Sequence, residues 1–402
     1  MPVSRRGFLQ FARPGSEPLA GAFLSARGLE AHFAEAQAQG PRARPLLPPG
    51  VDEIRISSNE NPLGPGRAAL DAILGKFPEA NRYPFNSTPS ETDLQAAIAA
   101  KLKVKPENIV LGAGSQEILK NSMRAFVTPT RGLVTALPTF ENCTGYAKKY
   151  KLPLTEVKVD SEFRLDVDPM IAAASKGAGL VFFNNPNNPT ATVHGVKTVT
   201  DMVARIHKAS PDTVILIDEA YHDYVTDPSY QTAVPLAMSV PNVIVARTFS
   251  KAYGMAGMRI GYAVGTADNV KKLAMLKMPY NVSVFGIGAA IASINDPQHI
   301  ADERARNTEV RAFTVNALKQ MGAKPADSQG NFLFADIGMP AKDFRDACAK
   351  QGVMVGRDFP PFEKTHCRIS IGTMDEMKKA TDVFREVLKA MMSAPAGSGK
   401  GK

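Results

Sequence analysis

The stretch NVIVARTFSKAYGMAGMRIGYAVG, residues 242–265, sets the pattern that organises this chain. Two short apolar runs, 242–246 and 260–265, flank a glycine-rich segment that carries Lys251 and Arg259. Apolar, β-branched runs bounded by Gly, Pro, Asn or Asp are typical of strands buried on both faces in a largely parallel sheet. We therefore expect Lys251 to follow directly on a buried strand.

The same pattern recurs along the preceding part of the chain. Helical patterns, for example 115–126 and 196–209, separate the apolar runs. Strands alternating with helices predict an α/β fold, with helices on both faces of a mostly parallel seven-stranded sheet. The five further predicted strands are 108–112, 133–136, 154–159, 179–183 and 213–217.

The chain changes character after residue 286. A long polar helix pattern covers 302–321, and shorter helices are predicted at 341–351 and 374–391. Strand-like runs lie between them at 331–337 and 366–372. A few strands beside helices predict a smaller α+β domain, to which the segment around 50–80 is expected to contribute.

The N-terminal segment has features of a targeting sequence. SRRGFLQ, residues 4–10, resembles a twin-arginine export signal, and AQA, 36–38, resembles a signal-peptidase site. Pro14, Glu17 and Arg27 weaken the apolar region between them. Two localisations stay open: periplasmic if the signal functions, and cytoplasmic if it does not.

Composition limits the classes of partner. The 402 residues carry a formal charge of +9, but the basic residues are scattered and form no recognised nucleic-acid motif, so we expect no nucleic-acid partner. No run approaches 18 apolar residues, so no membrane span is expected. Cys143, Cys348 and Cys367 lack metal-ligand spacing, which argues against a disulfide framework and a metal site.

Two residues with polar side chains follow the predicted strand 213–217. Asp218 comes directly after the strand, where α/β sheets place ligand-binding groups. A buried carboxylate needs a cationic partner, so Asp218 fits a ligand contact, a salt bridge or a helix cap. Tyr221 is expected to share the same end of the sheet.

Two other strand ends carry polar turns. NNPNNPTAT, 184–192, is a rigid turn that either presents an amide to a ligand or only ends its strand. LGAGSQEIL, 111–119, is a glycine-rich turn that opens a helix, and helix N-termini bind anions. Because Glu117 replaces the third glycine of a dinucleotide fingerprint, a phosphate cradle is the better interpretation.

Lys251 lies at a fourth strand end. A lysine desolvated near other cations has a lowered pKa and can form a Schiff base. Thr248, Ser250 and Arg259 could gather around a phosphate, to which arginine gives a bidentate contact. A carboxylate, an amide, a phosphate cradle and a lysine beside an arginine together fit one ligand, pyridoxal phosphate.

The chain resembles the class I/II, fold-type-I aminotransferases, and among them most of all the histidinol-phosphate aminotransferases. The likeness covers about residues 52–390. It implies a large domain built on the seven-stranded sheet, with a smaller α+β domain. The motifs are SSNENPLGP (57–65), NRYP (81–84), GAGSQE (112–117), PTF (138–140), NPNNPT (185–190), IDEAY (217–221), TFSKAYGMAGMRIGYA (248–263), PYNVS (279–283) and RISIGT (368–373).

The resemblance implies roles for matching residues. Lys251 would attach pyridoxal 5'-phosphate and move the substrate proton, and Asp218 would pair with the pyridine nitrogen. Asn188 and Tyr221 would hydrogen-bond the phenolic oxygen, and Arg368 would bind the substrate's carboxylate or phosphate. Further expected contacts are Gly114, Ser115, Gln116, Thr248, Ser250, Arg259 and Tyr83 of the partner subunit at the phosphate, Phe140 on the ring, and Asn61 at the substrate.

The resemblance also implies a homodimer and a division of the chain. We expect a possible signal and arm at 1–45, a segment shared with the small domain and the dimer contact at 46–83, and a large domain at 84–290. A small domain at 291–391 and a disordered tail at 392–402 would follow.

The sequence departs from the family pattern at the substrate side. Ala191 replaces a usual glycine, Leu63 stands where close relatives often place an aromatic residue, and Phe140 stands where they often have Tyr. We expect transfer of an amino group from an amino acid or amino-alcohol phosphate, histidinol-phosphate-like, to a 2-oxo acid such as 2-oxoglutarate. A decarboxylase, lyase or oxidase on the same scaffold stays open. Export would argue for a substrate outside histidine biosynthesis, whose intermediates are cytosolic.

Overall fold

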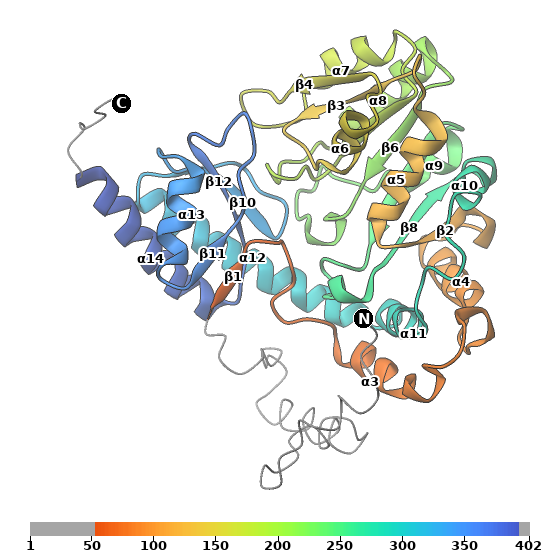
Figure 1. Ribbon diagram of the computed structural model, residues 1–402, viewed down its shortest axis with the longest axis horizontal. Coiled ribbons are helices and arrows are strands. Elements are labelled where there is room, and N and C mark those ends of the chain that lie inside the picture. Colours follow the sequence, from red (N-terminus) through yellow and green to blue (C-terminus); the bar gives the residue numbers. More distant parts are fainter. Residues whose placement is uncertain (1–52, 394–402) are drawn as a thin grey trace, which may run out of the picture. The chain divides into compact units, whose positions relative to one another are not determined.

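The computed structural model of the protein describes residues 53–393 (Figure 1). The predicted export signal at 4–10, the site at 36–38 and the tail after 393 lie outside the described residues. Within 53–393, no helix is long and apolar enough to cross a membrane.

A seven-stranded sheet forms the centre of the larger part of the molecule, in the order β2-β8-β7-β6-β5-β3-β4. All neighbouring pairs are parallel except those that β8 makes with β2 and β7. The connection from β7 to β8 is too short for a helical crossover, which explains the antiparallel pairing. The mostly parallel seven-stranded sheet is therefore confirmed. The strands are β2 (Ile109–Ala113), β3 (Leu133–Leu137), β4 (Leu154–Lys158), β5 (Leu180–Asn184), β6 (Val214–Asp218), β7 (Val243–Thr248) and β8 (Ile260–Gly265).

Both faces of this sheet are buried. Along β6, Val214 and Leu216 belong to one hydrophobic core, whereas Ile215 and Ile217 belong to another. This division follows from the alternation of side chains across a strand, and it explains why the inner strands are largely apolar. Helices cover the two faces (Figure 1). They are α4 (Glu91–Leu102), α5 (Ser115–Phe126), α6 (Asn142–Lys149), α7 (Val167–Ala174), α8 (Val196–Ala209), α9 (Val234–Ser239), α10 (Ala267–Ala274) and α11 (Val284–Ile294).

The smaller part has its own core. A three-stranded antiparallel sheet has the order β12-β10-β9, and a two-stranded parallel sheet joins β1 to β11. The apolar side chains of these strands pack with those of the long helices into one cluster. The elements are β1 (Ile54–Ile56), α12 (Pro297–Gln320), β9 (Lys324–Pro325), β10 (Phe332–Asp336), α13 (Ala341–Ala349), β11 (Val353–Val355), β12 (His366–Ser370) and α14 (Met374–Ser393).

The helix predicted from residue 302 begins earlier, at Pro297. Asp296 caps it by accepting a hydrogen bond from the backbone N–H of His299, 3.3 Å away. Proline is well suited to the first turn of a helix, because the N–H that it lacks has no partner there. The pair Asp296-Pro297 therefore marks the start of the helix, which the polar residue pattern alone did not indicate.

The N-terminal described segment divides between the two parts. β1 pairs with β11, its neighbour in Figure 1, although almost 300 residues separate them in sequence. α3 (Arg67–Gly75) instead packs against α11 beside the large sheet. Residues 57–66 connect the two and pass the site described below. Short 3-10 turns complete the chain: Phe77–Glu79, Pro84–Asn86, Pro106–Asn108, His222–Tyr224 and Ala256–Met258.

Candidate active site

Asp218 is the last residue of β6 and lies at the carboxyl end of the sheet, only 2% exposed. Its Oδ1 accepts a hydrogen bond from the backbone N–H of Ala220, at 3.2 Å. None of the described residues forms a salt bridge with it. Burial raises the pKa of Asp218 from 3.8 to about 7. A buried carboxyl without a direct salt bridge can accept an N–H from a ligand.

Lys251 follows β7 and lies at the same end of the sheet as Asp218. Its Nζ donates to the backbone oxygen of Ser58 at 3.2 Å and lies 5.7 Å from the ring centre of Tyr221. Burial, reinforced by the positive charge of Arg368, lowers the pKa of Lys251 from 10.5 to about 8. About a tenth of this amine is therefore uncharged at pH 7.

Arg368 reaches the site from β12 in the smaller part. Its Nη1 donates to Oδ1 of Asn188 at 2.9 Å, and its Nη2 donates to the backbone oxygen of Ser57 at 2.6 Å. The Nε atom is buried and has no partner among the described residues. The guanidinium also stacks on Phe359, 4.9 Å from the ring centre. An orphaned buried donor beside a fixed guanidinium marks a place for an anionic ligand.

Tyr221 joins these groups. Its buried hydroxyl oxygen accepts hydrogen bonds from Nδ2 of Asn188 at 3.3 Å and from Nδ2 of Asn59 at 3.1 Å. Burial raises the pKa of Tyr221 to about 12, so the phenol stays protonated. Side chains from the turn after β5 and from the segment 57–66 therefore converge on one hydroxyl, carried by a residue that follows β6.

A second group of predicted residues forms a cradle at the N-terminus of α5. Gly114 has φ +74° and its N–H donates to the backbone oxygen of Arg259 at 2.9 Å. Nη1 of Arg259 lies 3.4 Å from Oγ of Ser250, which is itself 2.9 Å from Oγ1 of Thr248. Ser115 opens the helix. Free helix N–H groups, two hydroxyls and a guanidinium form a suitable phosphate site.

The other predicted residues lie around these two groups. Gln116 is exposed on α5, and Phe140 is half-buried against the core under β3. Asn61 uses its amide on the backbone, donating to Ala252 O and accepting from Leu63 N, both at 2.9 Å. Its contacts thus hold the segment 57–66 against the Lys251 loop. Tyr83 is 64% exposed and contacts the rings of Phe85 and Tyr280.

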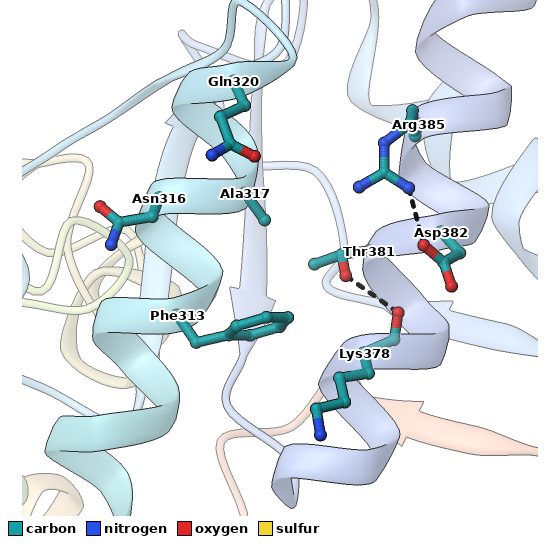
Figure 2. A pocket seen from close by; sticks show the side chains of 8 residues that line it. All are labelled: Phe313, Asn316, Ala317, Gln320, Lys378, Thr381, Asp382 and Arg385. Carbon is teal, nitrogen blue, oxygen red and sulfur yellow. Dashed lines mark hydrogen bonds and ion pairs between the residues drawn. The ribbon is translucent and has the colours of Figure 1, made fainter.

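The described residues contain no group of three or more His, Cys, Asp or Glu side chains that could hold a metal. A separate hollow of about 410 Å³ lies between α12 and α14 (Figure 2). Phe313 and Ala317 line it from α12, and Lys378, Thr381 and Arg385 from α14. None of the predicted site residues belongs to it, so it plays no part in the site.

The family model for class I and II aminotransferases matches residues 51–384. The chain belongs to this family.

Among relatives, the histidinol-phosphate aminotransferase of Anaeromyxobacter sp. is 34% identical over 347 residues, which covers 85% of this chain and 93% of the relative. That of Moorella thermoacetica is 33% identical over 345 residues, covering 84% and 86%. Among solved structures, a putative histidinol-phosphate aminotransferase from Erwinia carotovora atroseptica is 33% identical with a TM-score of 0.80, covering 86% of this chain and 99% of that one. One from Sinorhizobium meliloti, in complex with pyridoxal-5'-phosphate, is 27% identical with a TM-score of 0.76, covering 95% and 100%.

The structure explains two departures of this aminotransferase from common patterns. Glu117 closes the turn between β2 and α5, because its Oε2 accepts from Ala113 N at 2.7 Å. Ala191 has φ +61°, a backbone conformation that favours glycine, and it is fully buried. Its carbonyl accepts from Gln329 N at 2.8 Å, which ties the turn to the smaller part.

Sequence reasoning missed Asn59 and the pair formed by Glu219 and Arg247. Asn59 lies within the motif SSNENPLGP, but its contact with Tyr221 spans 162 residues and no local signal indicates it. Glu219 follows Asp218 and points to the other side, where it binds buried Arg247 at 2.8 Å. The adjacent carboxylates Asp218 and Glu219 at a strand end could have suggested that one of them forms a buried salt bridge.

Proposed function

We propose that this chain is a pyridoxal-phosphate-dependent aminotransferase that moves an amino group from an amino acid or amino-alcohol phosphate to a 2-oxo acid such as 2-oxoglutarate. The observation that carries the proposal is the convergence of the Lys251 amine, the buried Asp218 carboxyl and the Arg368 guanidinium on Tyr221. The names of the relatives, and the cofactor held by the Sinorhizobium meliloti structure, support it.

The residues present fit pyridoxal phosphate. A Cβ on Gly114 would overlap the Arg259 guanidinium, 2.9 Å from Cζ and closer still to Nη2, so the cradle needs a glycine there. Gly114, Ser115, Gln116, Thr248, Ser250 and Arg259 would hold the phosphate. Asp218 would pair with the pyridine nitrogen, and that charge would resolve the cost of a buried carboxylate. Asn188, Tyr221 and Phe140 would contact the ring, and Lys251 would attach it.

Bound pyridoxal phosphate supplies an electron-withdrawing ring that acidifies the Cα–H bond of an amino substrate. Lys251 Nζ would be the base that accepts this proton, because its lowered pKa of about 8 leaves part of the amine uncharged near neutral pH. Asp218, as a carboxylate, would keep the ring nitrogen protonated. The Tyr221 hydroxyl and the Asn188 amide would hold the ring oxygen through hydrogen bonds.

Arg368 would bind the carboxylate or the phosphate of the substrate. Its guanidinium is already oriented by Asn188 and Ser57, and its unpartnered Nε offers one further donor. A charge-assisted, multiply bonded contact of this kind selects planar or tetrahedral anions. We therefore expect donors that carry an anionic group beside the amine, with histidinol-phosphate-like compounds as the first candidates.

We also propose a homodimer in which Tyr83 reaches the phosphate site of the partner subunit. Tyr83, Phe85 and Tyr280 form one exposed aromatic cluster with ring centres 5.2 to 6.0 Å apart. Each of the three is more than half exposed in the single chain. Grouped exposed aromatics mark interaction surfaces, and a second copy would cover them.

The test is a screen of amino donors, with and without phosphate groups, on the cofactor-loaded protein with 2-oxoglutarate as acceptor. We expect glutamate to form and the cofactor absorbance to change on addition of a donor alone. Lys251→Ala should abolish both, whereas the matched control Lys176→Ala, at an exposed lysine after α7, should retain them. Carbon dioxide release without an acceptor would overturn transamination in favour of decarboxylation.

A further inference from the structure

The orientation of the Asn188 amide is fixed by its neighbours. Arginine has only donors, so the Asn188 atom that contacts Arg368 Nη1 at 2.9 Å must be the oxygen. The amide nitrogen of Asn188 then faces the hydroxyl oxygen of Tyr221 at 3.3 Å. Asn188 is therefore a donor to Tyr221, and the tyrosine oxygen is the acceptor.

The orientation of the Asn59 amide is fixed in the same way. The backbone N–H of Asn59 donates to Oγ of Ser370 at 2.8 Å, which leaves the serine hydroxyl free to donate its own hydrogen. That hydrogen goes to the Asn59 side chain at 2.7 Å, so the contacting atom is Oδ1. The Asn59 amide nitrogen consequently faces Tyr221, 3.1 Å from its hydroxyl oxygen.

Tyr221 therefore accepts two hydrogen bonds, and both lone pairs of its hydroxyl oxygen are occupied. The hydroxyl hydrogen remains, and no described residue accepts it. Tyr221 is nevertheless buried, and a buried donor is left unpaired only at a considerable loss of stability. The two amides thus make this hydroxyl a donor to whatever ligand lies beside it.

Asn59 is held firmly enough for this task. It is 1% exposed and adopts φ +54°, a conformation that asparagine tolerates better than most residues. Asn331 fixes its backbone, since Nδ2 of Asn331 donates to Asn59 O at 3.1 Å. Ser370, the other anchor, lies on β12 two residues after Arg368. Asn59 thus connects Tyr221 to the strand that carries the substrate-binding arginine.

We infer that Asn59 is a positioning residue that, together with Asn188, forces the Tyr221 hydroxyl to donate to the bound cofactor. This inference rests on the proposed function, because the acceptor would be the negatively charged ring oxygen of pyridoxal phosphate. A donor to that oxygen stabilises its anionic form and lowers the pH at which the bound cofactor loses its proton. The other charged groups around Tyr221 are Asp218, Lys251 and Arg368.

The test is the pH midpoint of the visible absorbance change of the cofactor-loaded protein without substrate. Asn59→Asp keeps the shape and the tolerance for positive φ but presents an acceptor, toward which the Tyr221 hydroxyl would turn. We expect the midpoint to rise by about one pH unit or more, the size of one lost charge-assisted hydrogen bond. Asn59→Gly, which accepts the same φ, should raise it in the same direction and serves if the aspartate variant does not fold.

Asn331→Ala is the matched control, because it loosens the same backbone without touching Tyr221. Its midpoint should move far less than that of either Asn59 variant. An unmoved midpoint in the Asn59 variants, or an equal shift in Asn331→Ala, overturns the inference while the proposed function stands. A wild-type protein that gives no cofactor absorbance band overturns the proposed function, and the inference with it.

Discussion

Replacing Gly114 with alanine should weaken binding of pyridoxal phosphate in addition to weakening the fold. Gly114 has φ +74° and ψ +164°, a region essentially restricted to glycine, where alanine costs about 1–3 kcal/mol. The new Cβ would also overlap the Arg259 guanidinium. Because the overlapped atoms are the end of a flexible side chain, Arg259 can turn away, and it would leave the cradle beside Ser250.

Loss of the Arg259 contact removes a charge-assisted hydrogen bond of about 1.5–3 kcal/mol to the phosphate. That corresponds to an increase of roughly 10- to 150-fold in the Kd of pyridoxal phosphate. The Kd is measured by absorbance titration of the cofactor-free protein, and the free energy of unfolding by urea denaturation of the same sample.

Gly177→Ala is the matched control. Gly177 also has a positive φ, +89°, but nothing lies within 4 Å of an added Cβ. It should lose about 1–2 kcal/mol of stability to backbone strain and keep the wild-type Kd. If Gly114→Ala binds the cofactor within twofold of wild type, the assignment of Gly114 and Arg259 to a phosphate cradle is refuted.

Three further predictions concern the fold around the site. In the cofactor-free protein, the pKa of Asp218 in the folded state, about 7, lies above its ordinary 3.8, so the folded state binds the extra proton. The free energy of unfolding should therefore fall by about 3 kcal/mol as pH rises from 4 to 7. Asp218→Asn should flatten that slope in urea denaturation, and an unchanged slope would contradict the assigned burial. Ala191→Gly should leave the stability in thermal unfolding nearly unchanged, because glycine relieves the strain of φ +61°. The control Ala290→Gly, at a buried position within α11, should lower the free energy of unfolding by about 1 kcal/mol or more. Equal losses in the two variants would exclude strain at Ala191. Arg247→Met, which leaves Glu219 buried without its partner, should lose about 3–5 kcal/mol, and adding Glu219→Gln should recover part of it; no recovery would show that packing and not charge is responsible.

The strands of the large sheet could be predicted from the sequence because both faces of the sheet are buried. Each predicted apolar run from 108–112 to 260–265 overlaps an observed strand. On the inner strands, alternating side chains enter two different cores, so these runs are largely apolar and the pattern is local; the edge strand β4 is partly exposed and carries Thr155, Glu156 and Lys158. The same logic placed Asp218 and Lys251 at strand ends, where a chain leaving a parallel sheet presents ligand-binding groups.

The local sequence did not indicate which of the groups at the strand ends contact one another. Asn188 and Arg368 are 180 residues apart and touch only because the smaller part carries β12 to the turn after β5. Asn59 and Tyr221 are brought together by a segment that pairs with β11 on one side and packs against α11 on the other. The sequence by itself therefore determined the layers, the strand ends and the chemical groups placed there. The tertiary structure alone decided their partners, hydrogen-bond directions and pKa shifts, because these depend on packing between segments distant along the chain.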